Sequence, residues 1–185
     1  TMKLYEASSK KNSKTCCSGV DIADARKVAK ILNIKHYIID YKEKFKESVI
    51  DKFVNSYIEG QTPIPCILCN QTVKFTDLIN FTRSIKSDIL ATGHYVKRID
   101  KGEEINLYQA DDGLKDQSYF LFATTQDQLK TLRFPLGGFS KSFIRGLAQH
   151  FGLTNAKEPE SQDICFIADG NYREFIKKNI SSNIK

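Results

Sequence analysis

Two cysteines three residues apart are the side chains of this sequence best suited to chemistry. Cys66 and Cys69 lie in the segment TPIPCILCNQTVKF, after a turn with two prolines and before an apolar helical pattern. Such a pair can form half of a zinc site, a redox-active dithiol or the seat of one nucleophilic thiol. The alternative without chemistry is a pair of small buried side chains, because free cysteines are often buried.

The ligand supply argues against a metal at this pair. Structural zinc needs four ligands, commonly from two paired knuckles. This sequence has one C-x-x-C motif, an adjacent pair at Cys16 and Cys17, and three histidines that stand singly. A thioredoxin-like dithiol would follow a strand and precede a helix, but here a helical pattern comes first. We therefore expect no metal site, and two interpretations stay open: a single nucleophile, or a pair of buried side chains without chemistry.

Cys69 is the better candidate for that nucleophile. We expect it where a helix begins, so that free backbone amides and the helix dipole stabilise its thiolate. Lys74 could add positive charge nearby. By contrast, Cys165 lies in the apolar segment QDICFIA, a predicted strand or extended segment, where an inert core thiol is the usual outcome. For Cys16 and Cys17, in a polar loop, the edge of the core is favoured over a function.

The hydrophobic pattern predicts the elements that must position these thiols. Apolar residues spaced three and four apart predict helices, and short apolar runs predict strands. The expected order is a strand at 1–7, a helix at 18–34 with a capping box at Ser18 and Asp21, a strand at 36–41, helices at 45–60 and 70–85, and a strand at 88–94. This alternation is typical of an α/β layer with a parallel sheet.

The pattern changes after residue 95. The segment VKRIDKGEEINLYQA predicts a hairpin that turns at Lys101-Gly102, and short helices should follow KDQSYFLFATT. Ser140 is expected to cap a helix, and NYREFIKKN predicts a closing helix. The expected inner face of the helix after Ser140 consists of Phe143, Ile144, Leu147 and Phe151.

Length and composition set the class of protein. The 185 residues suffice for one sizeable core, and a net charge of +6 favours polyanionic partners without requiring them. No apolar run approaches the ~20 residues that span a bilayer, and the sequence shows no signal-peptide pattern. We therefore expect a cytoplasmic protein with no membrane partner, whose five cysteines are thiols rather than structural disulfides.

Several motifs in a fixed order resemble one family. TPIPCILCNQTVKF, ATGHY, KDQSYFLF, FPLG and SQDICFI together resemble the tRNA-specific 2-thiouridylase family (MnmA/TrmU) over residues 2–177. The resemblance implies an incomplete PP-loop domain at 1–95, with a Rossmann-like parallel sheet of the adenine nucleotide α-hydrolase type. A small, mostly helical tRNA-binding segment at 96–185, with the hairpin and the second cysteine, would partly complete it.

The family replaces the 2-oxygen of the wobble uridine of tRNA by sulfur, which implies ATP with Mg as cofactor and a persulfide from a sulfur-relay donor protein. The nucleophile falls on Cys69 and the persulfide carrier on Cys165, two cysteines that could close a disulfide. Further matches, all expectations from the resemblance, are target-base contacts at Ile64, Pro65 and Cys66, tRNA contacts at His94, Lys115, Asp116 and Gln117, and ATP contacts at Met2 and Gly93. Ile64 departs from the family's usual Asn.

The family's ATP loop, S-G-G-x-D-S, and its C-terminal β-barrel domains have no match here. We therefore expect a fragment with weak or no activity alone, of marginal stability or paired with a chain that carries the loop. A non-catalytic tRNA-binding remnant and an unrelated zinc or thiol-redox protein are the alternatives.

Overall fold

The computed structural model describes residues 1–5, 19–158, 164–167 and 170–183. These residues form two compact units, one built from 1–65 and 152–185 and the other from 66–151. The expected α/β class is confirmed, because helices alternate with parallel strand pairs in the described residues. The domain boundary expected at residue 95 stays a prediction.

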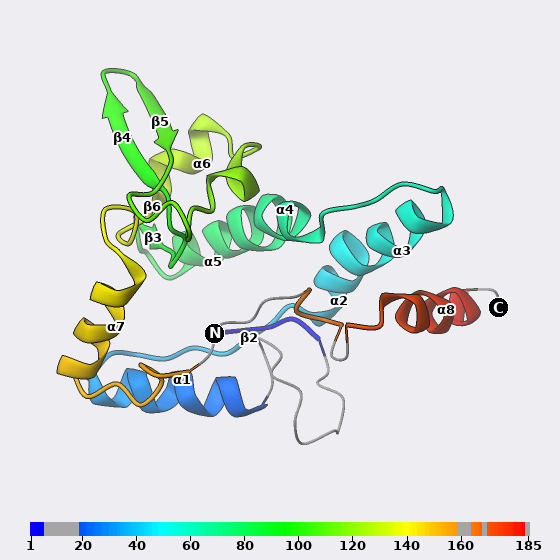
Figure 1. Cartoon of the computed structure of the whole chain (residues 1–185), viewed down its shortest axis with the longest axis horizontal. Helices are drawn as coiled ribbons and strands as arrows, with labels where there is room; N and C mark the ends of the chain where they lie inside the picture. Colours follow the sequence, from blue (N-terminus) through cyan, green and yellow to red (C-terminus); the bar gives the residue numbers. More distant parts are fainter. Residues whose placement is uncertain (6–18, 159–163, 168–169, 184–185) are drawn as a thin grey trace. The chain divides into compact units, whose positions relative to one another are not determined.

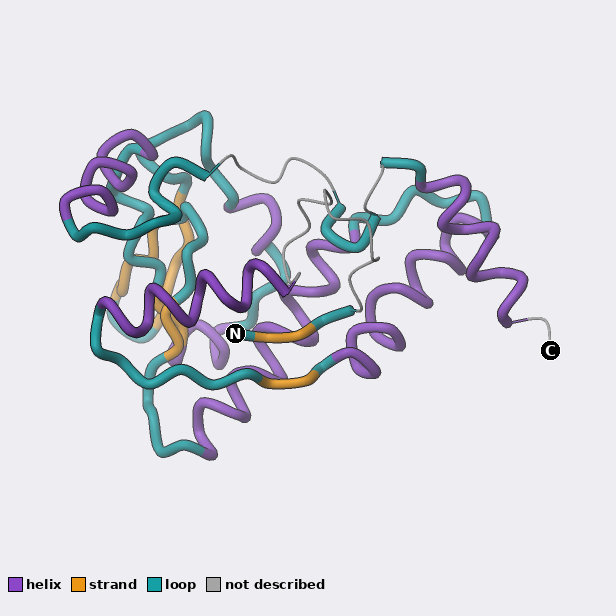
Figure 2. The backbone as a smooth tube through the Cα atoms, turned by 90° about the horizontal axis from the view of Figure 1, so that it is seen from below, coloured by secondary structure: helices purple, strands orange, loops and turns teal. Residues whose placement is uncertain are grey.

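The first unit contains a short parallel strand pair. β1 (Met2–Lys3) pairs with β2 (Ile39–Asp40) in the register Met2↔Ile39, and the two strands lie side by side in Figures 1 and 2. The expected buried strand at 36–41 is wrong in length and burial, since Tyr37 and Ile38 are 48% and 45% exposed. A parallel strand is buried when strands and helices cover it, and β2 pairs only with β1 among the described residues.

α1 (Gly19–Ile31) covers most of the first predicted helix. Ala29 is buried as expected, whereas Leu32 follows the helix and is 43% exposed. Asn33 has φ 52°, a left-handed conformation that ends a helix. The capping box at Ser18 lies outside the described residues, as do Cys16 and Cys17.

The second predicted helix is confirmed as one continuous run. It consists of α2 (Lys42–Phe45), the π-helical turn η1 (Lys46–Ile50) and α3 (Asp51–Ile58). Phe45, Val49 and Phe53 are at most 1% exposed, so the predicted face is the buried one. Gly60 follows with φ +77°, which only glycine adopts without strain.

The closing helix is also confirmed, as α8 (Tyr172–Asn183), which packs on α3. The expected strand around Cys165 is wrong for 164–167, the part that the structure describes. Those residues form a turn in which the Ile167 amide donates to the Ile164 carbonyl oxygen at 3.0 Å. The ring of Phe166 packs between those of Phe53 and Phe175, with centroids 5.3 Å from each, and this burial holds the turn.

The third predicted helix begins five residues earlier than expected. α4 (Pro65–Cys69) continues into the π-helix η2 (Asn70–Asp77) and then α5 (Leu78–Ser84). Proline suits the first position of a helix because its φ is already fixed and its missing N–H has no helical partner there. The expected face is correct at Phe75, Ile79 and Thr82, but Ile85 is 45% exposed.

The second unit also holds a parallel pair and a hairpin. β3 (Leu90–Ala91) pairs with β6 (Leu132–Arg133), a partner that the sequence did not predict. The predicted hairpin is confirmed as β4 (Lys97–Lys101) and β5 (Glu104–Tyr108), with its turn at Gly102-Glu103. The predicted short helices are η3 (Ser118–Leu121) and α6 (Gln126–Thr131).

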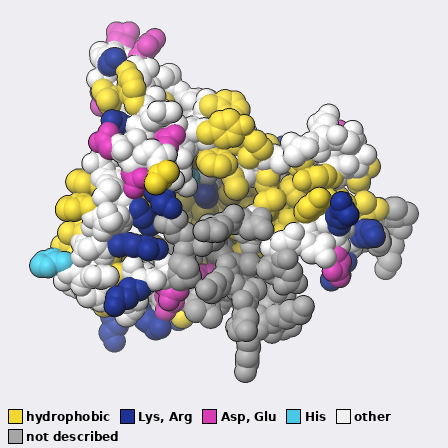
Figure 3. Space-filling view, viewed as in Figure 1, with side chains coloured by type: hydrophobic (Ala, Val, Ile, Leu, Met, Phe, Trp, Pro, Cys, Tyr) yellow, Lys and Arg dark blue, Asp and Glu magenta, His cyan; other side chains and the backbone are white. Residues whose placement is uncertain are grey.

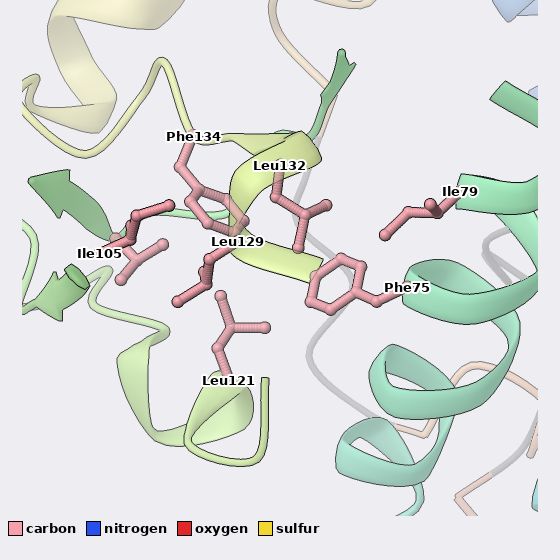
Figure 4. Packing of buried hydrophobic residues seen from close by; sticks show 8 residues of the cluster. Phe75, Ile79, Ile105, Leu121, Leu129, Leu132 and Phe134 are labelled. Carbon is pink, nitrogen blue, oxygen red and sulfur yellow. The ribbon is translucent and has the colours of Figure 1, made fainter. Parts of the chain in front are cut away.

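Side chains from η2, α5, β5, η3, α6 and β6 meet in the core of the second unit (Figure 4). The core residues are Phe75, Ile79, Val96, Ile105, Leu121, Leu129, Leu132 and Phe134. The FPLG motif follows β6 directly: Phe134 enters this core, and an added Cβ at Gly137 would lie 2.1 Å from the Val96 carbonyl oxygen. Only glycine therefore allows this close approach of two backbones.

α7 (Lys141–His150) begins as predicted, because the Ser140 hydroxyl accepts a hydrogen bond from the Phe143 amide at 3.2 Å. Its expected inner face is wrong. Phe143, Leu147 and Phe151 are 52%, 42% and 55% exposed. Helical periodicity shows which residues share a face, but it does not supply a surface that covers them.

Candidate functional site

Cys66 and Cys69 lie one turn apart on α4, and they differ in burial. Cys66 is exposed, whereas Cys69 is only 7% exposed. The expected position of Cys69 at a helix start is wrong, because α4 begins at Pro65 and Cys69 is its last residue. Burial raises the pKa of the Cys69 thiol, and the smaller opposing effect of the Lys74 charge does not compensate. In this conformation Cys69 is therefore a protonated thiol at neutral pH.

Lys74 is the cation that acts on the titratable side chains of this site. It lies five residues after Cys69, in a helix whose hydrogen bonds run from residue i to i+5. Its ammonium group lowers the pKa of Cys66 and of Cys69 against the raising effect of desolvation, which dominates at both thiols. It also acts on His94, so one cation influences three candidate residues.

Asn70 follows Cys69 and links this helix to η3. Its side chain is 3% exposed, and its Nδ2 donates to the Phe120 carbonyl oxygen at 3.2 Å. Its Oδ1 is a buried acceptor with no hydrogen-bond partner in the described residues. Sequence reasoning did not single out Asn70, although it stands beside the expected nucleophile in the LCN segment.

His94 lies at the end of the segment after β3, in an apolar setting. Its ring centroid lies 5.9 Å from that of Phe75 and 6.2 Å from that of Phe134, and its Nδ1 is 2.8 Å from the Thr92 hydroxyl oxygen. Burial, with the Lys74 charge, lowers the pKa of His94 to about 4. The ring is neutral at pH 7, so it can form hydrogen bonds but does not offer a cation to a phosphate.

Hydrogen bonds to its own side chains stabilise the loop that contains Lys115, Asp116 and Gln117. The Asp116 carboxylate accepts hydrogen bonds from the Ala110 amide at 2.8 Å and the Ser118 hydroxyl at 2.6 Å. Partial burial acts to raise the pKa of Asp116, but these hydrogen bonds outweigh it and hold the pKa below its ordinary value.

Gln117 attaches the same loop to the segment after His94. Its side-chain Oε1 accepts a hydrogen bond from the Tyr95 backbone amide at 3.0 Å, and its backbone amide donates to the Tyr95 carbonyl oxygen at 2.9 Å. The carboxylate of Asp116 and the side-chain oxygen of Gln117 therefore hold the loop in shape. The expected contact of these residues with tRNA stays a prediction.

The remaining expected site residues are distributed over both units. Gly93 follows β3 in the second unit, and an added Cβ there would touch only Leu136, at 3.8 Å. Met2 lies half-buried in β1 of the first unit. Ile64, 37% exposed, and buried Pro65 also belong to the first unit, at its junction with α4.

Cys165 lies in the first unit, half-buried on the turn that Phe166 anchors. The approach of Cys69 to Cys165 therefore stays a prediction. Within the described ranges, no three His, Cys, Asp or Glu residues gather as a metal site would require. In the same ranges, no helix has the length and apolar character to cross a membrane.

Comparison with known proteins gives matches along most of the chain. Residues 1–169 match the family model described as tRNA methyl transferase HUP domain. The chain is 55% identical over 179 residues to the tRNA-specific 2-thiouridylase MnmA of Orientia tsutsugamushi, and 56% identical over 181 residues to that of Rickettsia peacockii. It is 52% identical over 178 residues to the same enzyme of Wolbachia pipientis from Culex pipiens.

These similarities cover 96% of this chain but only 48–49% of the relatives. The chain thus spans about half the length of the curated relatives it matches. The family resemblance carried by the motifs is confirmed.

Proposed function

Because this chain belongs to the family described as tRNA methyl transferase HUP domain and is 52–56% identical to tRNA-specific 2-thiouridylases, we propose that it takes part in placing sulfur on C2 of a tRNA uridine. The observation that carries this proposal is that identity, which extends over 96% of the chain. The wobble uridine as target, and a cytoplasmic location, belong to the same proposal.

The proposed chemistry needs two sulfur atoms with different roles. A donor protein would load Cys165 with a persulfide, whose terminal sulfur attacks C2 of the uridine. ATP, bound with Mg, would supply the chemistry that turns the uridine oxygen into a leaving group. The position of Gly93 supports a role in binding such a ligand, because it follows a parallel strand and ligands of α/β sheets bind beyond the carboxyl ends of strands.

Cys69 would complete the transfer. Its thiolate attacks the Sγ atom of Cys165, the bond between the two persulfide sulfurs breaks, and the electron pair forms the C=S bond of the product. The new Cys69–Cys165 disulfide is then reduced by an external thiol. Alternatively, Cys69 attacks the persulfide before transfer and releases sulfide, which then attacks C2. Both routes require Cys69 as a thiolate, so its burial must be relieved when substrate binds.

The test joins product formation with disulfide mapping. The chain is incubated with unmodified tRNA, ATP, Mg and a persulfide donor, and thiolated tRNA is separated on a mercury-containing gel. We expect Cys69→Ser and Cys165→Ser each to abolish whatever product the wild-type chain forms. Mild oxidation with tRNA present should link the peptides of Cys69 and Cys165. The proposal fails if both serine variants thiolate tRNA as well as wild type does, or if oxidation never links these two cysteines.

The burial of Cys69 favours a second candidate function, RNA binding without catalysis. A protonated, enclosed thiol is typical of a structural cysteine. This alternative predicts that the chain binds tRNA, that Cys69→Ser leaves the affinity unchanged, and that no thiolated product forms with any sulfur donor.

A further inference from the structure

Two aromatic side chains at η3 are exposed to an unusual degree for their size. Tyr119 is 61% exposed and Phe122, directly after η3, is 70% exposed. Their ring centroids lie 6.4 Å apart, and the Tyr119 ring also contacts Phe120 at 5.7 Å. We call the Tyr119 and Phe122 rings the aromatic platform. Figure 3 shows hydrophobic side chains gathered on the surface beside α6, which follows this segment.

The backbone beneath the aromatic platform is anchored by a buried side chain and by hydrogen bonds. Leu121, between the two residues in the chain, is 1% exposed and belongs to the core of the second unit. The Phe120 carbonyl oxygen accepts from the Asn70 side chain, and Gln117 bonds to Tyr95 through two hydrogen bonds. Exposed rings on a fixed backbone lose little entropy when a planar group stacks on them.

The aromatic platform also lies beside α4, the helix that carries Cys66 and Cys69, which we call the thiol helix. The hydrogen bond from Asn70 to Phe120 joins the residue after Cys69 to the residue after Tyr119. Both ends of this link belong to the second unit. A nucleotide stacked on the platform would therefore lie close to a nucleotide held at the Cys66–Cys69 turn.

We propose that the aromatic platform stacks unpaired nucleotides of the tRNA loop that flank the target uridine. This inference rests on the proposed function, and it extends the expected RNA contacts to two exposed aromatic side chains. Single-stranded nucleic acids bind where aromatic rings lie beside basic groups, because every base offers a flat π face. Lys115 precedes η3, which begins at Ser118, and so supplies a cation in the same segment; the chain as a whole carries a net charge of +6.

The test measures binding of the full 185-residue chain to a labelled RNA stem-loop by fluorescence anisotropy over a range of salt concentrations. Tyr119→Ala and Phe122→Ala are each expected to weaken binding about 5- to 100-fold, the range for losing one stacked base. Phe122→Tyr should bind as wild type does. Phe143→Ala is the matched control, because Phe143 is an aromatic residue of the same unit and is 52% exposed.

The salt dependence separates stacking from charge. The alanine variants should keep the wild-type slope of log affinity against log salt, whereas Lys115→Gln should make it less steep by about 0.7–0.9. The wild-type chain and both alanine variants should bind a fully paired RNA of the same length with equal affinity. Circular dichroism spectra and melting temperatures confirm that each variant is folded.

Two results would overturn the stacking proposal alone. In one, the alanine variants bind the stem-loop as wild type does, while Lys115→Gln weakens binding. In the other, they change the oligomeric state and not the RNA affinity, which makes the platform a protein contact. If the wild-type chain binds no RNA at low salt, both this inference and the proposed function fail.

Discussion

Gly137 offers a sharp test of how the FPLG motif supports the site. An alanine Cβ at this position would lie 2.1 Å from the Val96 carbonyl oxygen and 2.4 Å from its carbon, so the two backbones would have to separate. Val96 is fully buried and lies two residues after His94. Gly138 is the matched control, because its added Cβ would meet only the Asp111 carboxylate, at an ordinary 3.8 Å.

The magnitudes follow from this difference in contact. Overpacking a close contact costs about 1–3 kcal/mol or more, which for a chain of this size lowers the melting temperature by about 2–4 °C per kcal/mol. We expect Gly137→Ala to lower the melting temperature by roughly 2–12 °C. Gly138→Ala should be neutral or stabilising by up to about 1 kcal/mol, since alanine restricts the unfolded chain.

Thermal unfolding followed by circular dichroism measures both variants. Hydrogen exchange adds a local readout, because the Asp111 amide donates to the Gly137 carbonyl oxygen at 2.9 Å and should exchange faster in Gly137→Ala. Equal melting temperatures for the two variants, with unchanged exchange at Asp111, would show that the close approach to Val96 does not constrain residue 137.

Three further predictions test the site and its supports. The pKa of His94 is lowered to about 4 in the folded chain, so between about pH 6.5 and pH 4 the unfolded chain binds one more proton than the folded chain. The free energy of unfolding should therefore fall as the pH falls through this window. His94→Gln should reduce this pH dependence in melting curves. Iodoacetamide at pH 8 should modify exposed Cys66 before buried Cys69, as read by peptide mass spectrometry, and equal rates would contradict the burial of Cys69. Phe53→Ala, in a fully buried ring cluster, should cost about 3–5 kcal/mol in urea unfolding, whereas Ile58→Ala on the same helix, 59% exposed, should cost far less.

Much of the local structure was predictable because it depends on nearby residues. The hairpin follows from the glycine turn between its two strands, and the helix after Ser140 follows from its capping hydroxyl. The run through Phe45 and Phe53 follows from apolar spacing. The family was readable too, because its motifs are short, ordered strings of residues.

Features that depend on distant residues were not predictable in this way. Cys69 is buried and does not stand at the first turn of its helix, which begins at Pro65, so its pKa is raised where a lowered pKa was expected. The pKa of His94 falls to about 4 because burial beside Phe75 and Phe134 disfavours the charged ring, and the Lys74 charge adds to this effect.

The sequence by itself determined the helices, the hairpin, the family and the candidate cysteines, because periodicity, caps and motifs are written in adjacent residues. Only the tertiary structure decided which thiol is buried, that Asn70 joins the thiol helix to Phe120, and that Tyr119 and Phe122 face solvent. Burial and its effect on charge arise from atoms far apart in the chain, so no local pattern encodes them.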